Sequence, residues 1–314
     1  MLEINLFGAG QARYGDQPLV GFPNQQIYML LCYLLLNRHD PLCRERLAAV
    51  FWEDYPAADS RKHLSKALWR LRQALQAAGV PADDYLLSSK EHVSFINSPA
   101  YQLDIEVFDT VLGQYQDIPG TELTAAQAAQ LEQAVGLYRG DLLTGLYEDW
   151  LVYERERLSV LHLKGLSKLM DFHQANQAYE RALSFGQTLL SYDQAHEKTH
   201  QRMMRLYWLM GDRSTALAQY KRCRQILRHE TGFPPSAETK YLYQQMARNQ
   251  FDPTAERGQG HGRLPVENLS EEALQELTIT ALRKLSRLHK IVEETTAELH
   301  HLEDLLTLTL VRSK

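Results

Sequence analysis

The segment between Asp59 and Asp83 contains no acidic residue, and it narrows the choice of fold more than any other part of the sequence. Leucines recur in it at steps of three and four, which places them on one face of a helix that we predict over residues 61–78. A solvated helix face normally mixes both signs of charge, so this segregation indicates an apolar back and a cationic front. The back consists of Leu64, Leu68, Leu71 and Leu75, and the cations are Arg61, Lys62, Lys66, Arg70 and Arg72.

Shorter predicted elements surround this helix. Residues 2–6 alternate apolar and polar side chains and the chain turns at Gly15-Asp16, so the first ~20 residues are expected to form short antiparallel strands. Helical periodicity starts at Gln25 and returns over residues 44–52. Apolar runs flank Ser88–His92, which predicts a small hairpin. We therefore expect an α+β unit over residues 1–100, with three helices closed by a hairpin.

The front of the predicted helix 61–78 carries the residue types that read a DNA major groove. Lys and Arg bind phosphates or guanine acceptors, Ser and Gln bond base edges, and Trp covers a sugar or a thymine methyl group. With the leucines turned inward, six side chains lie at or beside the front: Lys62, Ser65, Lys66, Trp69, Arg70 and Gln73. Arg44 and Arg46 open the preceding helix, where backbone amides also favour phosphate. The alternative interpretation of the cations is a charged surface helix with no partner.

Composition excludes several other classes of protein. The net charge of −5 implies no global attraction to nucleic acid, so a DNA-binding hypothesis depends on this local surface. Three cysteines without C-x-x-C spacing exclude a disulfide framework and fit a reducing cytosol. No apolar run is long enough for a membrane span, and the N-terminus lacks the pattern of a signal peptide. We expect a cytoplasmic, nucleoid-associated protein.

The rest of the chain is helical in pattern from about Thr124 to Asn249. Ala182-Leu183 and Ala216-Leu217 each precede an amphipathic run and lie 34 residues apart, the period of a tetratricopeptide (TPR) unit. We therefore predict an all-α, TPR-like domain over residues 101–249. A glycine-rich linker is expected over 250–268, and a heptad pattern predicts a long amphipathic or coiled-coil helix over 269–314.

Three segments together resemble the Streptomyces antibiotic regulatory protein (SARP) family. PLCRERLAAVFWEDYPAADSRKHLSKALWRLRQAL is similar to its winged helix, and LYRGDLLTGLYEDWLVYERERL to the start of its bacterial transcriptional activator domain. HEKTHQRMMRLYWLMGDRSTALAQYKRCRQILRHETGFPPSAETKYLYQQM resembles the TPR-like core of that domain. The resemblance runs from about residue 2 to 248. It implies a mainly α protein: an N-terminal winged helix-turn-helix, an all-α TPR-like domain and, here, a C-terminal helix.

The resemblance also implies function and contacts. It implies a DNA-binding transcription regulator of the activating kind, whose helical domain dimerises and contacts RNA polymerase. Helix 61–78 would enter the major groove, Arg61 would join the six front residues, and Arg44 and Arg46 would meet phosphates. The hairpin would be the wing, in which Lys90 is the only Lys or Arg residue and is followed directly by Glu91. The segment after residue 250 has no counterpart in the family's short members.

Two other patterns in the sequence compete with this interpretation. His196-Glu197-Lys198-Thr199-His200 matches the zinc motif H-E-x-x-H, but such short strings recur by chance, and the flanking residues are polar with no third ligand evident. Tyr147, Trp150 and Tyr153 stand at helical spacing, and we expect them to pack in a core. We therefore expect no enzymatic activity, cofactor or metal.

The hypotheses from sequence are then two. The first is a sequence-specific regulator that binds double-stranded DNA as a homodimer, recruits RNA polymerase, and uses 269–314 for self-association or a further protein. The alternative is a TPR-like interaction scaffold with a degenerate winged helix.

Overall fold

The computed structural model describes residues 1–19, 22, 24–95 and 101–252. The chain packs as two compact units, Met1–Leu189 and the residues from Leu190 onward. The predicted helix 269–314 and most of the predicted linker lie outside the described residues. No helix in the described part of the chain is long and apolar enough to span a membrane.

The first unit begins with the predicted antiparallel strands, β1 (Leu2–Asn5), β2 (Gln11–Tyr14) and β3 (Gln17–Pro18). A strand that the sequence did not predict, β7 (Tyr101–Leu103), joins them and gives the sheet order β3-β2-β1-β7. Strand β7 runs parallel to β1, with Leu2 opposite Tyr101. The chain therefore returns to its N-terminal sheet directly before the helical part begins.

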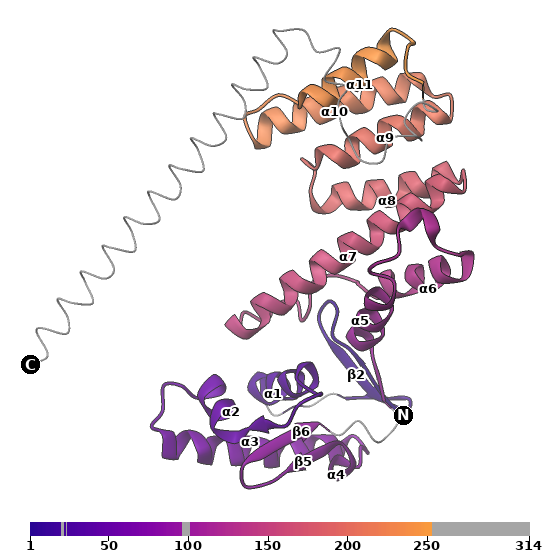
Figure 1. Ribbon diagram of the computed structural model, residues 1–314. Coiled ribbons are helices and arrows are strands. Elements are labelled where there is room, and N and C mark those ends of the chain that lie inside the picture. The colour runs from indigo at the N-terminus through magenta and orange to yellow at the C-terminus, as the bar shows by residue number, and fades with distance from the viewer. Residues whose placement is uncertain (20–21, 23, 96–100, 253–314) are drawn as a thin grey trace, which may run out of the picture. The chain divides into compact units, whose positions relative to one another are not determined.

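The three expected helices and the hairpin are present. They are α1 (Gln25–Leu36), α2 (Arg44–Phe51) and α3 (Ala57–Ala77), followed by a short α4 (Ala82–Tyr85) and the hairpin of β5 (Leu86–Ser88) and β6 (His92–Phe95). A two-residue strand, β4 (Leu42–Cys43), completes a sheet of order β4-β6-β5. Helix α3 packs against both α1 and α2 (Figure 1). This arrangement is a winged helix-turn-helix.

The start of α3 differs from the prediction. The helix begins at Ala57, four residues before Arg61, because Asp59 and Ser60 form its first turn and do not separate it from α2. The Ser60 hydroxyl is buried and donates to the carbonyl of Trp52 at 2.9 Å. The polar residues that resembled a linker therefore fix the approach of α3 to the end of α2.

The helical part of the first unit contains α5 (Asp104–Gln114), a 3-10 turn at Gly120–Glu122, α6 (Ala125–Val135) and α7 (Asp149–Ala175). Helix α5 lies before the point where the sequence pattern became helical, and it was missed. Glycine lets α7 approach α6 closely, since a Cβ atom on Gly165 would stand 2.7 Å from a methyl carbon of Val135.

The side chain of Asp104 accepts hydrogen bonds from the backbone of Leu6 and Phe7 at 2.8 and 3.0 Å.

Helix α8 (Tyr179–Tyr192) spans the division between the units. The second unit contains α9 (Glu197–Leu209), α10 (Arg213–Glu230) and α11 (Ala237–Ala247). Side chains of Asp212 and Ser236 cap α10 and α11. The two alanines at the 34-residue spacing, Ala182 and Ala216, are both fully buried. The helices thus repeat as the TPR spacing predicts, and the fold class is confirmed as mainly α.

A candidate nucleic-acid interface on helix α3

Helix α3 separates an apolar back from an exposed front. Its leucines Leu64, Leu68, Leu71 and Leu75 are buried against the first unit. Lys62, Ser65, Lys66, Trp69 and Gln73 are exposed, and Arg70 is half-buried beside them. Trp69 keeps 60% of its surface exposed, which is unusual for so large an apolar side chain. The structure therefore brings the six residues of the predicted front together on one accessible side of the helix.

The cations of this front differ in what they contact. Lys62 pairs with Asp59 at 3.0 Å, and Arg61 approaches Glu45 at 3.8 Å; all four side chains are half or more exposed. Exposed pairs of this kind contribute at most about 1 kcal/mol, so a phosphate can replace the carboxylate. Lys66 and Arg70 form no ion pair with any described residue. These two are the cations most available to a partner.

Arg44 has a different position from the one expected. Its guanidinium donates to the hydroxyls of Ser65 and Ser88, each at 2.8 Å, and so joins α3 to the first strand of the wing. Burial, with the charge of Arg72 as a smaller cause, lowers the pKa of Arg44 from its ordinary value. The Ser65 hydroxyl in turn donates to the carbonyl of Arg61 at 2.9 Å. Two of the predicted contact residues are thus already bonded to each other.

Arg72 makes a second link between α3 and the wing. It donates to the carbonyl of Leu86 at 3.0 Å and pairs with Asp83 at 3.2 Å. Sequence reasoning counted Arg72 among the cations but could not place it. The structure shows that it helps to hold the hairpin in place.

The wing and the start of α2 complete the candidate surface. Lys90 and Glu91 are both exposed at the tip of the β5–β6 hairpin, where the Ser89 hydroxyl accepts from the amide of His92 at 3.0 Å. Arg46 is exposed in the first turn of α2. The amide of Arg44, at the start of that helix, already donates to the carbonyl of Glu91 at 2.8 Å. That amide is therefore already hydrogen-bonded to the wing.

The expectation of core packing for three aromatic residues is wrong for two of them. Tyr147 is 92% exposed and Tyr153 is 73% exposed. Only Trp150 packs inward, with its ring centroid 5.1 Å from that of Tyr33. The cause is local: Tyr147 precedes α7, while Tyr153 lies on the open side of that helix.

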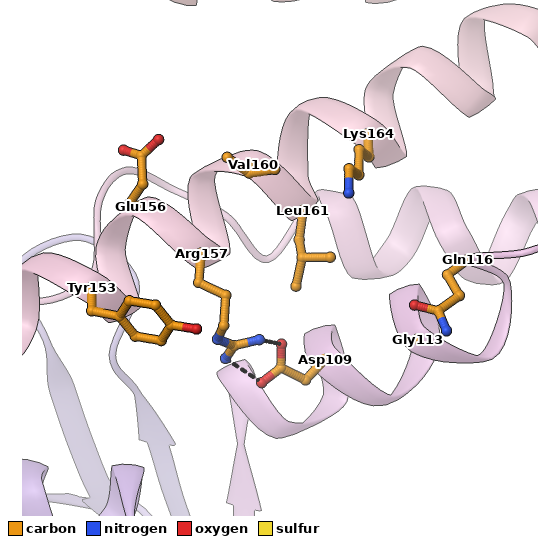
Figure 2. Close-up of a pocket in the computed structure, with 9 residues that line it drawn as sticks. All are labelled: Asp109, Gly113, Gln116, Tyr153, Glu156, Arg157, Val160, Leu161 and Lys164. Carbon is orange, nitrogen blue, oxygen red and sulfur yellow. Dashed lines mark hydrogen bonds and ion pairs between the residues drawn. The ribbon is translucent and has the colours of Figure 1, made fainter. Parts of the chain in front are cut away.

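A groove that the sequence did not reveal lies between α5 and α7 (Figure 2). It encloses about 630 Å³ and is bordered by Tyr153, Leu161 and Lys164. Within this lining, Arg157 donates two hydrogen bonds to the carboxylate of Asp109, at 2.9 and 2.8 Å. This pairing raises the pKa of Arg157 and satisfies these two charges, while Glu156 and Lys164 also line the groove. Neither residue was a sequence candidate, because they are 48 residues apart.

The residues of the H-E-x-x-H string are bonded within the second unit. His200 is fully buried, and its two ring nitrogens lie 2.9 Å from the carbonyl of Gln194 and 2.8 Å from the amide of Gln219. The carboxylate of Glu197 accepts from the backbone and hydroxyl of Ser236. Burial lowers the pKa of His200, which keeps the ring neutral. In the described residues no group of three or more His, Cys, Asp or Glu side chains could hold a metal.

The described residues thus combine a winged helix that has an exposed cationic front with a following set of helical hairpins. Residues 103–247, just under half of the chain, match the family model described as bacterial transcriptional activator domain. The predicted resemblance to SARP-type regulators is confirmed by this match.

Curated proteins of known name are also similar to the chain. The transcriptional regulatory protein EmbR of Mycobacterium tuberculosis and that of Mycobacterium bovis are each 24% identical to the chain over 264 residues. The alignment covers 79% of this chain and 64% of each relative, so the chain spans under two thirds of their length.

A solved structure, Mycobacterium tuberculosis EmbR in complex with a low-affinity phosphopeptide, superposes with a TM-score of 0.64 at 19% identity. The match covers 82% of this chain and 67% of that one and shows that the fold is shared.

Proposed function

We propose that the protein is a sequence-specific transcription regulator that binds double-stranded DNA with α3 in the major groove. Lys62, Lys66, Trp69, Arg70 and Gln73 contact bases or adjacent phosphates. Arg46, Arg61 and the wing residue Lys90 contact the backbone. Arg44 and Ser65 act mainly by fixing the wing against α3, because their polar atoms are bonded to each other.

The observation that carries this proposal is the exposed front of α3. Lys66 and Arg70 lie beside Trp69 with no carboxylate partner among the described residues. A helix that combines free cations, amide groups and an exposed indole has the chemistry for both phosphate contact and base readout. The match to the bacterial transcriptional activator domain supports a role in transcription.

The proposal includes self-association and activation. A single winged helix has a small interface, and two linked winged helices gain affinity through their effective concentration. We propose that the domain over 101–249 dimerises and recruits RNA polymerase, and that segment 269–314 adds a further protein contact. Truncation after Asn249 should lower the mass measured by light scattering or remove a bound protein. An unchanged mass with the same bound proteins would contradict the role of this segment.

The DNA-binding part is tested on a duplex selected by the protein from a random pool. The double variant Lys66→Ala/Arg70→Ala should bind this duplex at least about 10-fold more weakly. The slope of log affinity against log salt should also become shallower by about 1 to 2, because each phosphate contact contributes roughly 0.9 to it.

The matched control for this test is Lys198→Ala/Arg248→Ala, which removes the same charge from two exposed positions in the second unit. Its affinity should stay close to that of the parent chain. Equal affinity and slope for the α3 variant and the control would reject the assigned face. Failure of the parent chain to bind any duplex at low salt would favour the interaction scaffold.

A further inference from the structure

Helix α10 in the second unit has a second exposed cationic face that the proposed function does not use. Its buried side consists of Ala216, Gln219, Tyr220, Cys223 and Leu227. Two of these residues, Ala216 and Tyr220, belong to a hydrophobic cluster with Met204, Leu242 and Met246. The contacts with α9 and α11 therefore fix which side of α10 faces solvent.

The solvent side of α10 is cationic. No acidic residue occurs between Asp212 and Glu230, while the same stretch contains Arg213, Lys221, Arg222, Arg224 and Arg228. The last four are exposed, and none forms an ion pair with a described residue. Arg213 is also exposed, and its guanidinium lies 5.0 Å from the centre of the Trp208 ring.

The geometry of the helix brings these charges together. At 100° per residue, Lys221, Arg222, Gln225 and Arg228 lie away from the buried side, and Arg224 lies at its edge. Lys221 and Arg228 are two turns apart, about 10 Å along the axis. A duplex presents roughly six phosphates over such a length, counting both strands.

The other side chains on this face indicate the chemistry of its partner. Ser214, Ala218 and Gln225 are the exposed neutral residues between the cations, and the Ser214 hydroxyl donates to the carboxylate of Asp212 at 2.9 Å. The face lacks the exposed aromatic and apolar anchors that form the centre of a protein–protein contact. Guanidinium groups match phosphate oxygens with paired hydrogen bonds. Cations without an apolar centre therefore favour a polyanion over an acidic protein surface.

We infer that the outer face of α10 binds the phosphate backbone of duplex DNA without reading its sequence. This inference rests on the proposed function, which brings a duplex to the protein. The face adds a second contact from the same chain, so it strengthens binding to every sequence by a similar factor. It adds no discrimination, because phosphates carry no base information.

The test uses the full chain with the triple variant Lys221→Gln/Arg224→Gln/Arg228→Gln. Binding is measured by fluorescence anisotropy over a salt series, on the selected duplex and on a random duplex of the same length. Affinity for both should fall by the same factor, about 10-fold or more at low salt, and the salt slope should become shallower by about 2 to 3. The ratio of the two affinities should not change.

The control triple variant, Lys198→Gln/Lys240→Gln/Arg248→Gln, loses the same charge from positions outside α10. If the α10 variant matches this control in affinity and slope, the inference is overturned. It is also overturned if DNA binding is unchanged while reporter transcription falls, because the face would then serve an acidic protein.

These outcomes are separable from failure of the proposed function. Lys66→Ala/Arg70→Ala reports on α3, so a loss there with an unaffected α10 variant removes the α10 inference alone. Circular dichroism melting of each variant verifies that the exposed substitutions leave the fold intact.

Discussion

Helices α3 and α10 are built on the same plan and differ in what stands between their cations. Each buries an apolar stripe, and each has an acid-free stretch with five Lys and Arg residues. On α3 the cations alternate with a hydroxyl, an exposed indole and an amide, whereas the exposed neutral residues between the cations of α10 are Ser214, Ala218 and Gln225, with no aromatic ring among them. Charge alone supplies affinity, and sequence discrimination requires groups that distinguish base edges.

Their surroundings also differ. Arg44 and Arg72 fasten α3 to the β5–β6 hairpin through hydroxyl and carbonyl oxygens. Helix α10 is held through its buried side, by α9 and α11. A reading helix benefits from fixed orientation, because bonds to base edges depend on geometry more steeply than the attraction of a cation to phosphate.

The largest expected effect comes from removing the apolar back of α3. Leu71 is fully buried, and Leu71→Ala should lower the free energy of unfolding of the first unit by about 2–5 kcal/mol. DNA binding should be lost at the temperature where this unit melts. The comparison is Leu227→Ala in α10, which should destabilise the second unit and leave the α3 front intact. Calorimetry with parallel DNA-binding assays measures both; equal melting of parent and Leu71→Ala would contradict the assigned core.

A smaller effect distinguishes recognition of the base sequence from electrostatic attraction to the phosphates. Trp69→Ala and Gln73→Ala remove exposed neutral groups, so each should reduce the preference for the selected duplex by about 1–3 kcal/mol. Affinity for random DNA should hardly change. The matched variant on α10 is Gln225→Ala, for which we expect no change in preference. A loss of preference there would show that α10 also reads sequence.

The smallest expected effect concerns the fastening of the wing. In Arg44→Lys a single ammonium replaces the guanidinium that joins Ser65 to Ser88, which should cost about 1 kcal/mol of local stability. Amide hydrogen exchange over His92–Phe95 should become faster, and affinity for the selected duplex should fall only a few-fold. Arg46→Lys keeps an exposed charge and serves as the control. If the two variants exchange equally, the bridge does not hold the wing.

Much of the winged helix was predictable because its signals are local. The leucine stripe, the change of period at Gln25 and the two short runs of the hairpin each specify an element from neighbouring residues. The start of α3 was misplaced because Asp59 and Ser60 have the composition of a loop, and only the buried bond from Ser60 to Trp52 shows that they begin the helix.

What the sequence could not predict depends on pairing between distant segments. Strand β7 is three residues long and exists because it pairs with β1, about one hundred positions earlier. The exposure of Tyr147 and Tyr153 depends on the turn before α7 and on the side of α7 that faces α5. The front of α3 was predicted residue by residue, but the bonding of Arg44 to Ser65 was not, since 21 positions separate them.

Asp104 has a consequence for how motion passes along the chain. It directly follows β7, it is the first residue of α5, and its carboxylate is bonded to the amides of Leu6 and Phe7. No residue separates the strand from the helix at this point, and the two hydrogen bonds hold the start of α5 to the N-terminal strands. A rotation of α5 must therefore move the N-terminal sheet with it. Any hinge within the first unit therefore has to lie outside the connection between β7 and α5.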